Sequence, residues 1–163
     1  MTVASADWEG RNAGLWDDLD ALEAEEFTAR MELLAAELPA GDAVGLFERG
    51  AAFDSTGSPD RAVPLYEAAL SAGLGGERRR RAVIQMASSV RNLGDPERAL
   101  ELLQAEATRP ADGLEDAVAT FTALTLVDLG REREAVGVAL GALAAHLPRY
   151  NRSVARYAAE LTG

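Results

Sequence analysis

Cysteine and lysine are both absent from the 163 residues of this chain. Without cysteine there is no disulfide, no thiolate nucleophile and none of the common cysteine-bound structural zinc sites. Without lysine there is neither the lysine of a phosphate-binding loop nor one that forms a Schiff base. All 16 basic residues are therefore arginine, a choice that indicates a GC-rich bacterial genome.

Histidine is almost absent too, because His146 is the only one. A Ser–His–acid triad needs a histidine as its base, but His146 follows an alanine-rich segment and stands just before Pro148, which is typical of a helix end. No serine has the surroundings of a nucleophile elbow, and no glycine-rich loop follows a strand pattern. Asp17, Asp18 and Asp20 lack the spacing of a calcium loop. We therefore expect no enzyme activity, no metal and no cofactor.

Long apolar runs are also missing, since charged residues interrupt every window of about 18 residues that a membrane helix needs. The first ten residues carry Asp7, Trp8 and Glu9 where a signal peptide is apolar. We therefore expect a cytoplasmic protein that makes no membrane contact. The 27 acidic residues outnumber the basic ones and give a net charge of −11, which disfavours nucleic acid as a partner.

A short turn motif occurs three times in the chain. Residues 57–62 recur almost unchanged as residues 94–99 and more loosely as residues 130–135, at spacings of 37 and 36 residues. The leading glycine ends one helix in the left-handed conformation. Ser58 or Asp95, followed by proline and an acidic residue, then starts the next helix. Each motif therefore predicts a tight turn between two antiparallel helices.

The residues around these turns resemble the tetratricopeptide repeat superfamily over about residues 42–148. That pattern asks for a large residue, a glycine and an aromatic on the first helix, then alanine and an aromatic on the second. The first repeat supplies Leu46, Gly50, Phe53, Ala62 and Tyr66, and the later copies are weaker. Within this superfamily, residues 76–94 resemble a family of small bacterial proteins of unassigned biochemical function that are thought to dimerise.

The resemblance implies an all-α array of about three helix pairs, at residues 42–75, 79–112 and 115–148. Because a repeat array exposes an apolar face at each end, we expect caps there. A half-repeat that ends at Pro39 caps the start, and a helix over 149–162 caps the end. Residues 15–163 are thus expected to form a single domain, and residues 1–14 an arm that is poorly ordered or docked.

The first helices of stacked repeats line a concave surface, where we expect a groove that binds a peptide. The polar stripe on the middle first helix suits the backbone of an extended peptide, and its arginines suit a carboxylate. An alternative interpretation is that these residues form a solvated face or pair with Asp54 and Asp128. Of the basic residues 78–81, only Arg81 is expected in the groove. The expected groove positions are Val44, Phe47, Glu48, Ala51, Asp54 and Ser55 in the first repeat, Arg81, Ile84, Gln85, Ser88, Arg91 and Asn92 in the second, and Ala117, Thr120, Phe121, Leu124, Val127 and Asp128 in the third.

Two functions follow from these features. Apolar positions such as Phe47 and Phe121 suit an amphipathic helix or the protein's own N-terminal segment. Trp8, Trp16 and Phe27 are expected either to pack on the N-terminal helix or to form dimer contacts, because exposed aromatics are costly. The chain is therefore expected to be an adaptor that binds a protein or peptide in its groove, or alternatively a homodimer that uses the groove or N-terminal helix.

Overall fold

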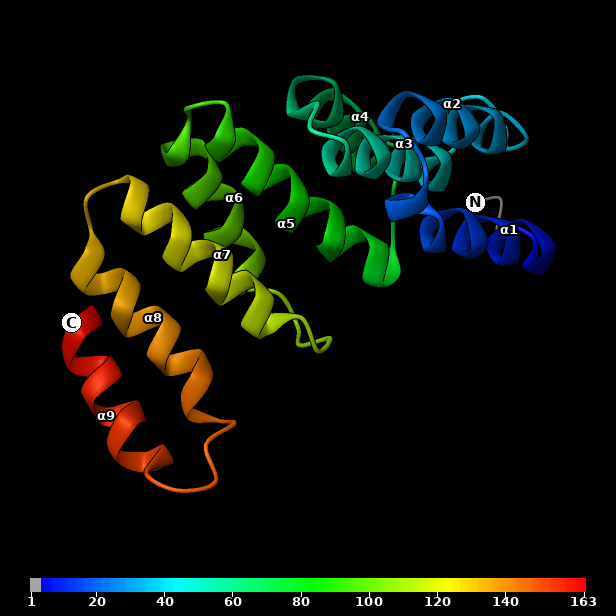
Figure 1. Cartoon of the computed structure of the whole chain (residues 1–163). Coiled ribbons are helices and arrows are strands. Elements are labelled where there is room, and N and C mark those ends of the chain that lie inside the picture. Colours follow the sequence, from blue (N-terminus) through cyan, green and yellow to red (C-terminus); the bar gives the residue numbers. More distant parts are fainter. Residues whose placement is uncertain (1–3) are drawn as a thin grey trace. The chain divides into compact units, whose positions relative to one another are not determined.

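A computed structural model describes residues 4–163 as helices joined by short turns, with no strand among them (Figure 1). The predicted all-α helical array is confirmed. From α3 to α8 the helices form three consecutive pairs: α3 with α4, α5 with α6, and α7 with α8. The first helices of these pairs are α3, α5 and α7. The elements are α1 (Ala6–Asp17), the short 3-10 helix η1 (Leu19–Ala21), α2 (Ala24–Ala35), α3 (Ala43–Ser55), α4 (Pro59–Ser71), α5 (Gly76–Asn92), α6 (Pro96–Ala107), α7 (Glu115–Asp128), α8 (Glu132–Ala144) and α9 (Asn151–Thr162).

The chain consists of two compact units, of which unit 1 runs as far as Gln85 and unit 2 comprises Met86–Gly163. The division falls inside α5, in the second repeat. Unit 1 thus holds α1 to α4 with the first part of α5, and unit 2 holds the rest of the helices. The single domain over residues 15–163 stays a prediction, as does the arm over residues 1–14, of which residues 1–3 lie outside the described residues.

The three repeated turns close as their sequence predicts. Gly57, Gly94 and Gly130 have φ angles of 82°, 92° and 68°, in the left-handed region that suits glycine. The amide that follows each glycine bonds back to a carbonyl five residues earlier, which satisfies the end of the first helix. Asp95 caps the next helix by accepting a bond from the Arg98 amide at 3.1 Å. Ser58 makes no such side-chain bond, so the prediction of a capping role was wrong for that serine.

Unit 1 is centred on the α3–α4 pair, where the two helices approach closely at Gly50. A Cβ at that position would lie 3.1 Å from the Tyr66 ring, so the glycine makes room for a large aromatic. Tyr66 is fully buried, and its ring lies 6.1 Å from that of Phe47. Phe53 and Tyr66, the aromatics that the repeat pattern predicts, are both buried, and Tyr66 packs against Phe47, which the sequence placed in the groove.

Unit 2 is built on α7, α8 and α9. Its core contains Leu100 of α6, Leu126 of α7 and Ala135 of α8. The last helix packs along α8, as Figure 1 shows, and the contact is closest at Gly137. A Cβ on Gly137 would lie 2.9 Å from the Ala158 carbonyl oxygen, so only glycine allows this approach. The C-terminal helix therefore covers the apolar side of the last repeat.

Candidate protein-binding faces

Helix α1 packs onto α2 and α3 in unit 1 through its two tryptophans. Trp8 is only 2% exposed, and its indole Nε1 donates to the Leu34 carbonyl at 2.9 Å. Trp16 packs edge-on against the fully buried Phe27, with 5.1 Å between ring centroids. All three residues that the sequence named as candidate dimer contacts are thus used in packing within unit 1.

A charged network lies beneath α1. The Glu48 side chain on α3 is only 2% exposed, and it accepts two hydrogen bonds of 2.8 Å, one from the Trp16 indole and one from Arg78 Nε. The two terminal nitrogens of Arg78 donate to the two carboxylate oxygens of Glu9, at 2.9 and 2.6 Å. Arg78 therefore joins α1, α3 and the start of α5.

The network explains how a glutamate can be buried in this core. An ionised carboxylate away from water is costly unless it is paired and hydrogen-bonded, and Glu48 has both kinds of partner. The pairing with Glu9, reinforced by Glu48, raises the pKa of Arg78 although burial opposes the rise. The sequence placed Glu48 on the groove face of α3 but did not reveal Arg78 and Glu9 as its neighbours.

The remaining groove positions of unit 1 are mostly occupied by contacts inside the unit. Phe47 was expected on the groove surface, but it is fully buried because it packs against Tyr66. Asp54 accepts a bond from the Tyr66 hydroxyl at 3.3 Å. The Arg81 guanidinium lies 5.4 Å from the Phe47 ring centre, and Gln85 is half-buried. Burial, with Asp54 nearby, raises the pKa of Tyr66.

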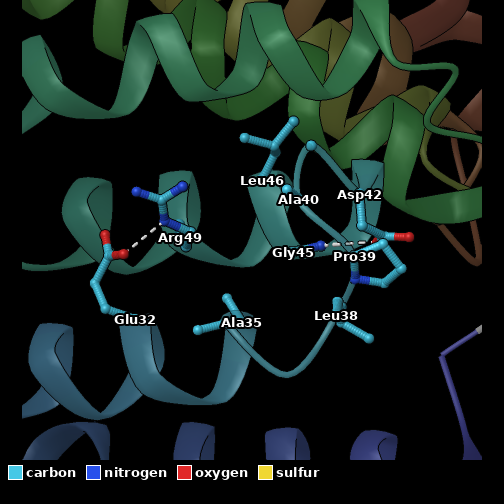
Figure 2. A pocket seen from close by; sticks show the side chains of 11 residues that line it. Glu32, Ala35, Leu38, Pro39, Ala40, Asp42, Gly45, Leu46 and Arg49 are labelled. Carbon is cyan, nitrogen blue, oxygen red and sulfur yellow. Dashed lines mark hydrogen bonds and ion pairs between the residues drawn. The ribbon is translucent and has the colours of Figure 1, made fainter.

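Two cavities open on unit 1. The larger, of about 700 Å³, is lined by Glu9 of α1, the α2–α3 turn, residues 72–78 and Arg81. The smaller, of about 340 Å³, lies between the end of α2 and α3, and Figure 2 shows the side chains around it. Its charged groups, Glu32 and Arg49, pair with each other at 2.8 Å (Figure 2). The larger cavity therefore adjoins α1 and its carboxylate, whereas the smaller is a recess with internally paired charges.

Unit 2 presents a different surface, which we call the α7 face: Phe121, Leu124, Val127 and Asp128 of α7 with Arg91 of α5. The four α7 residues recur at helical spacing on one side of that helix. Leu124 is 42% exposed and Val127 is 50% exposed, although both are apolar.

The charged end of the α7 face joins two helices of unit 2. Arg91 donates to the Asp128 carboxylate at 3.0 Å and to the Asn92 side-chain oxygen at 3.3 Å. Arg91 therefore contacts two other residues that the sequence assigned to the groove, Asn92 and Asp128. Ser88, one turn before Arg91 and Asn92 on α5, is half-buried.

These features define a helical-repeat protein, with helix pairs closed by glycine turns and with polar and apolar side chains on the first helices. Comparison with protein-family models matches residues 43–161 to the Tetratrico peptide repeat family, so the chain belongs to that family. Membership indicates a protein–protein interaction module of a generally non-catalytic kind. A search of curated proteins and a search of solved structures each found no match.

Residues 4–163 hold neither a membrane-spanning helix nor a metal cluster. No helix in this range combines the length and apolar character needed to cross a membrane. The same residues contain no group of three or more histidine, aspartate or glutamate side chains placed to hold a metal ion.

Proposed function

We propose that the chain is a non-catalytic adaptor and that its α7 face binds a peptide or amphipathic helix of another protein. The observation that supports this is the exposure of Leu124 and Val127 beside the Arg91–Asp128 ion pair. An amphipathic helix bound to repeat helices needs such a surface, with apolar anchors for its buried side and charges that fix its orientation.

On the α7 face, burial of Leu124 and Val127 contributes more free energy than the Arg91–Asp128 ion pair. Complete burial of a leucine or valine side chain contributes about 1.5–3 kcal/mol, so covering the exposed halves of Leu124 and Val127 contributes about 1 kcal/mol each. Ion pairs near the surface contribute about 0–1 kcal/mol. Arg91 can therefore turn from Asp128 to a carboxylate of the partner at little cost.

Val127→Glu tests this proposal, because it places a charge among the apolar contacts and should weaken partner binding at least tenfold. Val136→Glu on α8 is the matched control, since Val136 is also 50% exposed and lies outside the α7 face. A partner captured with the wild-type chain is then purified, and its affinity for all three proteins is measured by calorimetry. Equal weakening by both substitutions, or by neither, would reject the α7 face.

The alternative proposal is a homodimer, in which the α7 face of one chain covers that of a second. The same exposed Leu124 and Val127 motivate it. Light scattering over a range of concentrations distinguishes the two functions. A dimer that Val127→Glu dissociates and Val136→Glu leaves intact supports self-association; a wild-type chain that stays monomeric rejects it.

A further inference from the structure

Helix α1 is poorly suited to being a helix on its own. Gly10 and Gly14 lie in its interior, and a Cβ at either position would meet nothing within 4 Å. Neither glycine is therefore needed for close packing, yet each lowers helix stability relative to alanine. The helix also has no basic residue in its last turn, where Asp17 opposes the helix dipole.

The position of α1 depends instead on a few specific side-chain contacts. Trp8 and Asn12 are its buried residues. Its indole anchors are Trp8, which donates to the Leu34 carbonyl, and Trp16, which donates to Glu48. Its charged anchors are Glu9, which pairs with Arg78, and Arg11, which pairs with both oxygens of Glu37 at 2.6 Å. A weak helix held by specific anchors is the arrangement expected of an element that can be released.

We infer that the surface beneath α1 is a second helix-binding site, which α1 occupies as a competitor within the chain. We call it the α1 site: the Leu34 carbonyl, Glu48 and Arg78. Its partner is an acidic amphipathic helix of another protein. That helix places a carboxylate on Arg78 and, seven residues later on the same face, an indole N–H on Glu48, as Glu9 and Trp16 do.

The tether of α1 favours a foreign helix over the α1 of a second copy. Leu19 and Leu22, in the segment between α1 and α2, pack against the Phe27 and Met31 core. They hold α1 beside its own site at an effective concentration of the order of millimolar. An identical helix from a second chain has the same helix stability as the tethered α1 and no effective concentration to add to it. A foreign helix without the two interior glycines is a more stable helix and can therefore compete.

The competition gives a quantitative expectation. A ligand that needs the open form binds more weakly in proportion to the fraction of chains in that form. Gly10→Ala and Gly14→Ala each stabilise α1 without a new contact, and each should lower the open fraction about fivefold. The double variant, the closed chain, should therefore bind a competing helix about 25-fold more weakly than wild type. Glu9→Gln, the opened chain, should bind it several-fold more tightly.

The probe is a fluorescein-labelled peptide of residues 5–18 that carries Gly10→Ala and Gly14→Ala, and binding to each full-length chain is followed by anisotropy. The control peptide also carries Glu9→Gln, so that it lacks the carboxylate for Arg78. Circular dichroism melting shows that each chain is folded. The α1 site requires that the opened chain bind the probe most tightly, wild type less tightly and the closed chain least tightly. It also requires that the control peptide bind at least tenfold more weakly than the probe.

Three outcomes would overturn the inference. These are equal affinity for the wild-type and closed chains, equal binding of the two peptides, and no binding even to the opened chain. A doubling of mass by light scattering when Glu9 is replaced would instead assign the site to the α1 of a second copy. Val127→Glu should leave peptide affinity unchanged, so failure of the α1 site and failure of the α7 face are distinguishable.

Discussion

Glu48 is the residue on which unit 1 most depends for its polar contacts. Glu48→Ala removes one acceptor from the Trp16 indole and one from Arg78, and breaking a buried ion pair costs about 3–5 kcal/mol. Arg78 keeps Glu9 and is partly exposed, so we expect a loss of about 2 kcal/mol in the free energy of unfolding. Urea denaturation measures this loss. Glu32→Ala, which breaks the half-exposed pair with Arg49, is the control and should cost under about 1 kcal/mol.

Tyr66 makes the stability of unit 1 sensitive to alkaline pH. Its pKa in the folded chain is raised above the unfolded value of about 10, chiefly by burial. The neutral phenol therefore stabilises the fold fully below about pH 10, and this contribution is lost as the pH rises above that value toward the folded pKa. Melting temperatures across this range should fall in wild type and fall less in Tyr66→Phe. Tyr157→Phe, at an exposed position, should behave like wild type.

At the scale of the helix, two glycines of α8 have opposite roles that one experiment can separate. Gly137→Ala places a Cβ 2.6 Å from Thr162 Cγ2 and 2.9 Å from the Ala158 carbonyl oxygen, so α9 must shift, at a cost of about 1–3 kcal/mol. Gly141→Ala meets nothing within 4 Å and should stabilise the helix by up to about 1 kcal/mol. Thermal unfolding should therefore move in opposite directions. A shift of the same sign in both variants would contradict the packing of α9.

The helices and turns were predictable because their signals are local. A glycine, a polar cap and a proline within six residues fix the turns at 57–62 and 94–99, and helical spacing fixes the apolar side of each helix. Even here Ser58 differs, since its side chain makes no capping bond. The position of Gly137 against α9 carried no local signal, because a glycine in a helix looks the same in sequence whether it is packed or exposed.

At the scale of the molecule, the charged contacts were harder to predict than the fold. Glu9 and Arg78 are 69 residues apart in the chain, and no spacing rule brings them together. Glu48 stood on the expected groove face, but its burial depends on α1, which lies outside the repeats. The contact between Arg91 and Asp128 is the exception, because the alternative interpretation of the polar stripe named Asp128 as a partner, on the next first helix. The pairing of Glu9 with Arg78 depends on tertiary structure alone.

The net charge of −11 bears on which of the two proposed functions is favoured. Like charge on two copies opposes their association, most strongly at low salt. At this scale the charge favours the adaptor over the homodimer.

Both tryptophans of the chain, Trp8 and Trp16, lie in α1. The tryptophan emission of the protein therefore comes from this one helix, with one indole buried and the other bonded to a carboxylate. Release of α1 would move both indoles into water and shift the emission to longer wavelength, while far-ultraviolet dichroism would change little because α3 to α9 stay helical. The chain thus carries its own optical reporter for the state of a single helix, and no label has to be added to read it.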